Sequence, residues 1–377
     1  MMAACSPRVS EVVASLPPRL RRRFHQAKAL YRFLGNRRVS AEALLERVCE
    51  LGLEGLEGAE LLALLDVSPL EKPYARAMEA LAPVGKGRVP GYELLTCLLL
   101  EGQGHLGLGY GRLLAYGERG MTSLPQEVLK AVSCCHQLLG GRGLRPTYVA
   151  DRGFDDRKLF RLVLALGEGF VVRVYHDRLL DDGRRLGAVA EGLALPHRAW
   201  AWLKVRGRYR RVEVRFGFAR LSLEGRELAL VVSQVPELGR RGRWWLLTNL
   251  PVATAQDALR VVEAYRRRWQ VDEFFRLLKA GLGLERVQVR GLTSLRKLVA
   301  VMLGLALFLW EVKQGEGPFK DLLLWLGGKL GLKSERDGPY LLMRGLLRLL
   351  NYEAAHDALG RAPPNLICHP LQEERSG

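Results

Sequence analysis

The sequence lacks the cysteine patterns of disulfide frameworks and of common zinc sites. Its six cysteines are scattered, and no two of them are separated by two residues. This distribution predicts a reduced, intracellular protein rather than a secreted disulfide scaffold. The segments "CCH" at 134–136 and "CHP" at 368–370 leave a zinc site as the weaker alternative, because neither has the usual ligand spacing.

An apolar leader and a run long enough to cross a bilayer are absent too. The first residues, "MMAACSPRVSEVV", lack the apolar core of a signal peptide. The most apolar run, "LVAVMLGLALFLW" at 298–310, is shorter than the roughly 20 residues of a membrane-spanning helix. We therefore expect a buried helix at this position and a soluble protein without a membrane partner.

Acidic residues are scarce relative to basic ones. The 377-residue chain has 58 lysines and arginines against 40 aspartates and glutamates, a formal net charge of +18. This surplus predicts a polyanionic partner, and nucleic acid is the first candidate. A generally basic protein without such a partner is the alternative. The apolar content of 48% predicts a globular chain with two domains, or with one domain that carries a large insertion.

Strand and helix patterns alternate over the first half of the chain, which predicts an α/β fold. The apolar run at 60–73 fits a helix end or a buried strand, and "YELLTCLLLEG" is predicted to be a buried strand. The strand "TYVAD" precedes a helix for which Asp155 is the expected N-cap. We interpret "GQGHLG" at 102–107 as a hairpin turn, because no suitable helix follows it for a nucleotide site.

The second half changes character at about residue 177. Polar and apolar residues alternate, which predicts antiparallel hairpins that interrupt the core. A long helix is then expected from about Thr254 to Lys279. The expected regions, in chain order, are a helical N-terminal region that is a candidate contact to DNA (1–57), the first part of the core (58–176), the β-rich insertion (177–243), the end of the core (244–285) and a helical C-terminal region (286–377).

The segment "YRRRWQVDEFFRLLK" at 265–279 has two faces when it is drawn as a helix with about 100° per residue. Apolar residues gather on one face: Ala264, Val271, Phe274, Phe275 and Leu278. The other face has one tyrosine, three cations and one acid: Tyr265, Arg268, Asp272, Arg276 and Lys279. Glu273 falls roughly 100° away from Asp272. A solvated charged face is the ordinary explanation, but one carboxylate among cations also suits a metal ligand beside a phosphate-binding surface.

Two more aspartates stand where α/β proteins place functional side chains. Asp66 ends the apolar run "LLALLD", and Asp151 ends the strand "TYVAD". A metal site that acts on phosphodiesters needs several carboxylates together, so both are candidates to join Asp272. Either one alone would more often cap a loop or a helix.

Taken together, these residues resemble the DDE transposases of bacterial insertion sequences. The branch that they resemble, insertion-sequence family four, has the signature Tyr, two residues, Arg, three residues, Glu, six residues, Lys. Tyr265, Arg268 and Lys279 fall at those positions, and Asp272 stands where the family has glutamate.

The segments around the first two aspartates resemble the same family. "DVSP" at 66–69, in which Ser68 replaces the family's threonine, and "VADRGF" at 149–154 are similar to the segments of its catalytic aspartates. Trp244 matches a tryptophan with which family members hold a flipped base. The likeness runs from about Leu61 to Gly283.

The resemblance implies an RNase H-like core in which Asp66, Asp151 and Asp272 hold two Mg²⁺ or Mn²⁺ ions. It implies metal-dependent cleavage at insertion-sequence ends and strand transfer into target DNA. The implied partner is double-stranded DNA, namely the inverted-repeat ends and the target, bound by a homodimer in the bacterial cytoplasm at the nucleoid. The expected DNA contacts are Trp244, Tyr265, Arg268, Arg276 and Lys279.

Asp272 is one methylene shorter than the family's glutamate, which leaves three interpretations of the site. Asp272 is the third acid, Glu273 takes its place, or the copy is inactive. The alternatives to a transposase are an RNase H-fold DNA nuclease without joining activity and a catalytically inactive, transposase-derived DNA-binding protein.

Overall fold

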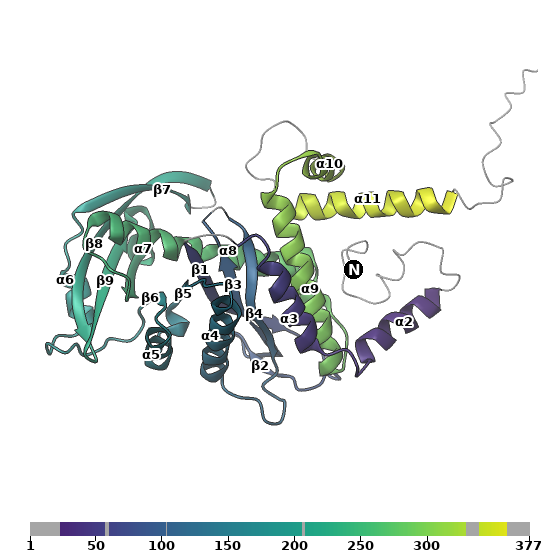
Figure 1. Ribbon diagram of the computed structural model, residues 1–377, viewed down its shortest axis with the longest axis horizontal. Coiled ribbons are helices and arrows are strands. Elements are labelled where there is room, and N and C mark those ends of the chain that lie inside the picture. The colour runs from purple at the N-terminus through teal and green to yellow at the C-terminus, as the bar shows by residue number, and fades with distance from the viewer. Residues whose placement is uncertain (1–22, 57–59, 103, 206–207, 329–338, 360–377) are drawn as a thin grey trace, which may run out of the picture. The chain divides into compact units, whose positions relative to one another are not determined.

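The computed structural model describes residues 23–56, 60–102, 104–205, 208–328 and 339–359 (Figure 1). The chain divides into two compact units. The sheet unit comprises Leu45–Tyr74 and Ala80–Phe275, and the helical unit comprises Met1–Leu44, Ala75–Glu79 and Arg276–Gly377.

Within the described residues, the sheet unit contains a 10-stranded mixed sheet. Its strands, in order across the sheet, are β2 (Ala82–Val84), β3 (Val89–Leu100), β1 (Leu61–Glu71), β5 (Pro146–Ala150), β6 (Gly169–Arg173), β10 (Arg243–Thr248), β9 (Arg226–Gln234), β8 (Arg208–Leu223) and β7 (His197–Val205), with β4 (Leu106–Leu114) paired to β3. β1, β5 and β6 are parallel neighbours, whereas β3 and β4 are antiparallel. The core order β4-β3-β1-β5-β6 confirms the predicted RNase H-like α/β fold.

The strands of the predicted insertion belong to the same sheet. β7, β8 and β9 lie between β6 and β10 in sequence, and β10 pairs antiparallel with both β6 and β9. Alternation in β8 follows the predicted pattern, because Val212, Val214 and Phe216 are buried while Arg211 and Arg215 are exposed. The insertion therefore extends the core sheet.

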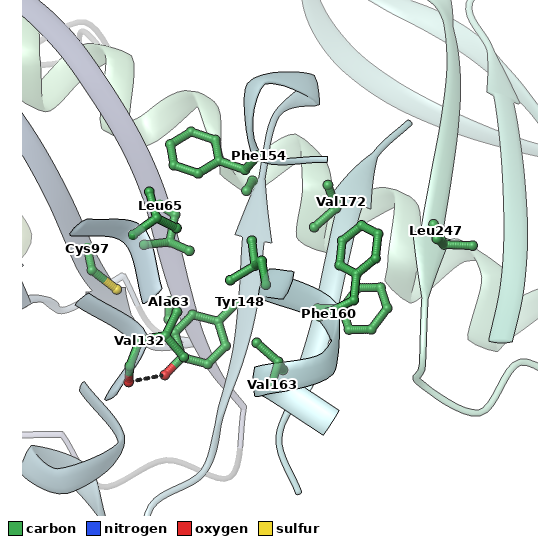
Figure 2. Close-up of a cluster of buried hydrophobic side chains, with 14 of the residues drawn as sticks. Ala63, Leu65, Cys97, Val132, Tyr148, Phe154, Phe160, Val163, Val172 and Leu247 are labelled. Atoms are coloured by element: carbon green, nitrogen blue, oxygen red, sulfur yellow. Dashed lines mark hydrogen bonds between the residues drawn. The ribbon is translucent and has the colours of Figure 1, made fainter. Parts of the chain in front are cut away.

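Helices cover both faces of the sheet. They are α4 (Leu124–Gly140), α5 (Arg157–Ala165), α6 (Leu186–Gly192), α7 (Ala255–Arg267) and α8 (Trp269–Arg276). Ala63 and Leu65 of β1 pack in one core with residues of α4 and α5 (Figure 2). Because successive strand residues face opposite sides, Leu64 and Asp66 point to the other face, on which α7 contacts β5, β6, β9 and β10.

The core under α4 and α5 fixes β5 and β6. Phe160 of α5 stacks on Phe170 of β6 with ring centroids 4.8 Å apart. The Tyr148 hydroxyl donates to the Val132 carbonyl oxygen at 3.2 Å (Figure 2). Burial of each large apolar side chain contributes about 1.5–3 kcal/mol. This packing fixes the strand ends from which the candidate acids project.

The ambiguous segments of the first half are now assigned. The run at 60–73 is the strand β1 rather than a helix end, and it continues past Asp66 to Glu71. The glycine-rich segment connects the antiparallel strands β3 and β4, and Gly104 N donates to Glu101 O at 3.0 Å. The hairpin prediction is confirmed.

Asp155 is not the N-cap of α5, and that prediction is wrong. Asp156 is the N-cap of α5, because its carboxylate accepts a hydrogen bond from Lys158 N at 2.8 Å. Asp155 is buried instead. The sequence could not separate the two, because consecutive aspartates offer the same capping chemistry.

The helix expected from Thr254 to Lys279 begins as predicted but is divided. Thr254 forms a capping box with Asp257 at its start. α7 and α8 are separated at Arg268, and a π-helical turn, η4 (Leu277–Gly281), follows α8. A π-turn has more residues per turn than an α-helix. The two-face angles therefore do not place Lys279.

The helical unit confirms the predicted helical terminal regions. Its helices are α2 (Arg23–Gly35), α9 (Leu292–Gln314), α10 (Pro318–Leu326) and α11 (Pro339–Leu359), and α3 (Ala41–Gly52) spans the boundary of the two units in sequence. By length and composition α9 could cross a membrane, but 67% of its most apolar window is buried inside the structure. A single such helix is a weak indication, because core helices share these properties. Parts of the predicted terminal regions, 1–22 and 360–377, lie outside the described residues.

Candidate active site

Two of the three candidate acids lie side by side on neighbouring parallel strands. In the pairing of β1 with β5, Leu65 is opposite Ala150. Asp66 and Asp151 are the next residues along the two strands, and paired strands are about 4.8 Å apart. The negative charge of Asp151 acts on Asp66. The sheet thus brings together two acids that are far apart in sequence.

Asp151 begins the turn that follows β5. It is the N-cap of the short 3₁₀ helix η2 (Arg152–Phe154), and its carboxylate accepts a hydrogen bond from Gly153 N at 2.7 Å. A side chain at Gly153 would begin 3.1 Å from the Asp151 Oδ1 atom. The turn therefore orients the carboxylate, so the capping role and the candidate catalytic role fall on one residue.

A buried ion pair anchors the same turn. Asp155 Oδ1 lies 2.6 Å from Arg178 Nη2, and the two side chains are 0% and 4% exposed. Asp155 Oδ2 accepts hydrogen bonds from Tyr175 N at 2.7 Å and His176 N at 2.8 Å. The Arg178 guanidinium also lies 5.3 Å from the centre of the Phe160 ring. These contacts tie the turn after β5 to the segment after β6.

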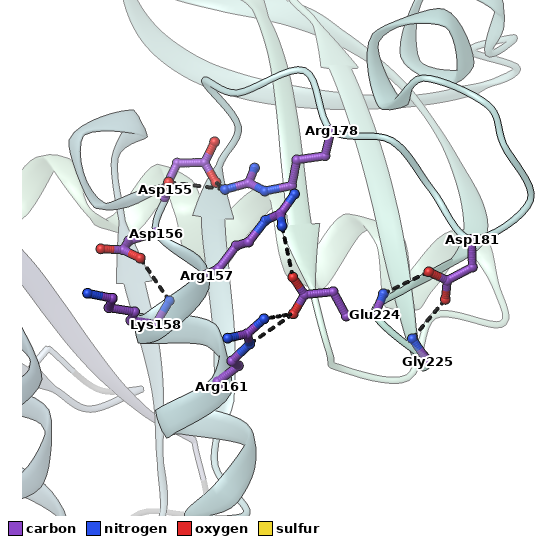
Figure 3. A network of polar contacts seen from close by, with 9 residues as sticks. All are labelled: Asp155, Asp156, Arg157, Lys158, Arg161, Arg178, Asp181, Glu224 and Gly225. Carbon is purple, nitrogen blue, oxygen red and sulfur yellow. Dashed lines mark hydrogen bonds and ion pairs between the residues drawn. The ribbon is translucent and has the colours of Figure 1, made fainter.

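The same region joins α5 to the insertion (Figure 3). The Glu224 carboxylate, in the β8–β9 turn, pairs with Arg157 at 3.2 Å and with Arg161 at 2.9 Å. Asp181 accepts hydrogen bonds from the backbone of Glu224 and Gly225. The far end of the insertion is therefore held to the core helix that follows Asp151.

Arg268 links the first acid to the third. Its Nη1 atom lies 2.8 Å from Asp66 Oδ2, and its Nη2 atom lies 3.4 Å from Asp272 Oδ2. The Arg268 side chain is 16% exposed, and its backbone keeps the helical conformation where α7 ends. The aspartates differ, since Asp66 is 14% exposed and Asp272 is 61% exposed.

The protonation of Asp66 is shifted by this setting. Burial raises the pKa of Asp66 to about 6, the Arg268 charge and a hydrogen bond from Val67 N oppose this, and Asp272 and Asp151 add to the rise. A carboxyl group with a raised pKa among other acids is typical of functional sites. It also occurs in structural ion-pair networks.

The two faces predicted for the helix at 265–279 are only partly as expected. Val271, Phe274 and Phe275 are buried, as the angles predict. Asp272 is exposed and reaches Arg268, whereas Glu273 is half-buried. Adjacent helical residues point about 100° apart, so the structure brings Asp272 to the Arg268 side of α8.

Tyr265 is not on an open polar face, contrary to the angular prediction. It is 6% exposed, and its ring meets Trp244 of β10 edge to face, with centroids 5.0 Å apart. Burial raises the pKa of the Tyr265 hydroxyl, while Arg268 and Arg173 oppose the rise. Trp244 is half-buried and supports Tyr265 beside the acids.

Arg276 and Lys279, the last two residues of the predicted polar face, belong to the helical unit. Arg276 ends α8 and is exposed, and Lys279 lies in η4, where its Nζ atom is 3.5 Å from Glu285 Oε1. The prediction that both contact DNA stays a prediction.

The three candidate acids have the ligand chemistry that a hard divalent cation prefers, but their side chains are not grouped as metal ligands. Asp66, Asp151 and Asp272 offer only carboxylate oxygens, the ligands that Mg²⁺ and Mn²⁺ prefer. Among the described residues, however, no three histidine, cysteine, aspartate or glutamate side chains are gathered closely enough to hold a metal ion. Arg268 supplies the positive charge between two of the acids instead. The same finding gives no support to a zinc site at 134–136, and Cys368 lies outside the described residues.

Part of the chain, including two of the three candidate acids, matches a known protein family. Residues 130–309 match the family described as the transposase DDE domain. This match supports a DDE transposase. The matched stretch includes Asp151 and Asp272, whereas Asp66 precedes it. Among solved structures, the chain is similar to the cryo-EM structure of the piggyBac transposase synaptic complex with hairpin DNA, at 13% identity and a TM-score of 0.41. That alignment covers 81% of this chain and 55% of the other.

Sequence reasoning missed two arginines around the candidate site. Arg173 ends β6, and its charge opposes the rise that burial causes in the pKa of the Tyr265 hydroxyl. Arg178 forms the ion pair with the buried Asp155. In the sequence both are ordinary members of a basic chain.

Proposed function

We propose that this protein is a cut-and-paste transposase of the insertion-sequence branch with the Tyr-Arg-Glu-Lys signature. It cleaves DNA at the ends of its element and joins those ends to target DNA. The observation that supports this most is the meeting of Asp66 and Asp151 on paired strands, with Arg268 joining Asp66 to Asp272. The net charge of +18 suits double-stranded DNA as the partner. A homodimer in the bacterial cytoplasm would bring two ends together at the nucleoid.

Each residue has a role in this proposal. Asp66, Asp151 and Asp272 would hold Mg²⁺ or Mn²⁺, two ions in all. Such ions, when bound, activate a water or a DNA 3′-hydroxyl and stabilise the leaving oxygen of a phosphodiester. Arg268 holds two of the acids in place before DNA arrives. Tyr265 and Trp244 shape the wall beside them.

Two further contacts belong to the helices that follow α7. Arg276 and Lys279 are proposed to contact DNA phosphates, which position the strand without reading its sequence.

A cleavage and joining assay tests the proposal. Labelled DNA with the element's ends is incubated with the protein, Mg²⁺ or Mn²⁺ and a target plasmid. We expect cut ends and joined products, both abolished by Asp272→Asn and kept by the matched Glu273→Gln. Loss of activity in Glu273→Gln with activity kept in Asp272→Asn would move the third acid to Glu273. Cut ends without joined products would favour an RNase H-fold nuclease.

A second candidate is a DNA-binding protein without catalysis. The replacement of the family's glutamate by the shorter Asp272 favours it. It predicts salt-sensitive DNA binding and no cleavage with either ion.

A further inference from the structure

Two tryptophans stand exposed on the outermost strand of the insertion. β7 ends the order of strands across the sheet (Figure 1). On this strand Trp200 is 61% exposed and Trp202 is 66% exposed. Ala201 between them is buried, so the strand presents both indoles on one side. Neither indole is used by the core or by the candidate active site.

Arginines of β8 share this side of the sheet. In the pairing of the two strands, Trp200 is opposite Glu213, and Trp202 is opposite Arg211. Opposite residues of paired strands project to the same face. The Trp face is defined by these side chains: Arg198, Trp200, Trp202, Arg211, Glu213 and Arg215.

The Trp face is basic as well as aromatic. The Arg211 guanidinium lies 5.1 Å from the centre of the Trp200 ring. Arg198 and Arg215 share one carboxylate, that of Glu213, at 3.2 Å and 3.3 Å. Three guanidinium groups thus face a single acid. Such a surface complements a polyanion and is a poor match for a basic partner.

The buried core does not include these side chains. The opposite side of β8 holds the buried residues Val212, Val214 and Phe216. The side that bears the arginines is covered further along the strand, where a Cβ atom at Gly217 would lie 2.1 Å from the Ala194 carbonyl oxygen. Large apolar side chains left open on an edge strand are a liability unless a ligand uses them.

The spacing of the tryptophans suits stacked bases. Side chains at alternate strand positions are about 6.8 Å apart, close to the separation of two rings with one planar base between them. Aromatic platforms flanked by cations are the usual means of holding unpaired nucleotides. We propose that the Trp face binds unpaired bases of a DNA strand by stacking on Trp200 and Trp202, with phosphates held by the arginines. The inference rests on the proposed function only in taking DNA as the partner.

The test measures single-strand affinity without any cleavage. A fluorescein-labelled twelve-nucleotide oligothymidylate is titrated with the full chain in EDTA, and anisotropy is followed. We expect Trp200→Ala and Trp202→Ala each to weaken binding about tenfold (1.4 kcal/mol), and the two phenylalanine variants to retain most of the affinity. The affinity for a duplex of equal length should change less than about twofold in these variants, because the bases of a duplex are already stacked. Trp325→Ala is the matched control, since that tryptophan is 71% exposed in the helical unit.

Three outcomes would overturn the inference. Unchanged single-strand binding in the alanine variants is one, and equal loss on single strand and duplex is another. A change of mass in light scattering with DNA affinity kept would assign the edge strand to a second copy of the chain. Asp272→Asn separates this inference from the proposed function. If Asp272→Asn cleaves and joins DNA as wild type does, or if wild type does neither, while binding of the oligothymidylate still requires both tryptophans, only the proposed function falls.

Discussion

Asp155→Asn should destabilise the sheet unit strongly, although the substitution changes the size of the side chain very little. The amide oxygen can still accept hydrogen bonds from Tyr175 N and His176 N. The Arg178 guanidinium, 4% exposed, would lose its counter-charge. A buried charge without its partner is far less stable than the intact pair.

The structure sets the size of the effect. Removing one partner of a buried ion pair costs about 3–5 kcal/mol. Arg178 keeps hydrogen bonds to the carbonyl oxygens of Asp155 and His176, so we expect the lower end, about 3 kcal/mol. For a domain of this size, this corresponds to a fall in Tm of about 6–12 °C. Circular dichroism melts at pH 7 measure it directly.

A matched control separates burial from pairing as the cause. Asp182 pairs with Arg184 at the same distance of 2.6 Å, but its side chain is 46% exposed. Asp182→Asn should leave Tm unchanged within error. Replacing both partners of the buried pair, as in Asp155→Asn with Arg178→Met, removes the unpaired charge and keeps the acceptor for Tyr175 N and His176 N, so it should recover most of the loss. An Asp155→Asn variant that melts together with wild type would refute the reasoning.

Two predictions concern the acids themselves. Burial raises the pKa of Asp66 from 3.8 to about 6, so the native state binds this proton more tightly than the unfolded state, and stability falls as pH rises between about 4 and 6. Asp66→Asn should therefore be more stable than wild type at pH 8, by on the order of 3 kcal/mol, and the difference should vanish near pH 4. A variant that is less stable than wild type in melts at pH 8 would contradict this. Asp272→Glu should increase the cleavage rate at saturating Mn²⁺, because the longer side chain brings its carboxylate closer to Asp66 and Asp151. A fall in that rate would show that the aspartate has the length that the site needs.

The central fold could be predicted because its signals are local. An apolar run marks β3, the run at 60–73 fits a helix end as well as the strand β1, and the switch from helix to strand patterns marks β5 and β6. The meeting of Asp66 and Asp151 follows from these assignments, since residues at corresponding positions of parallel neighbours lie together. The predicted region boundaries are not tested by the division into two units and stay a prediction.

The missed features depend on contacts between distant segments. Arg268 and Asp66 are separated by 202 positions, and no local pattern reports which acid a cation will meet. Tyr265 has polar neighbours in the helical projection, but Trp244 from another strand covers it. Helical angles give the direction of a side chain, whereas its burial depends on what the sheet places opposite.

The position of Arg268 gives the charge balance of the site a simple form. Three carboxylates and one guanidinium leave a net charge of two negative units when all are ionised, which the first of the two proposed divalent cations would cancel. Without Arg268 the raised pKa of Asp66 would rise further, because the arginine opposes the effect of burial. Arg268 therefore favours the charged form of Asp66, and only that form can hold a metal ion. Arg268 holds Asp66 of β1 at 2.8 Å but Asp272 of α8 only at 3.4 Å. The arginine therefore positions Asp66 more firmly than it positions Asp272.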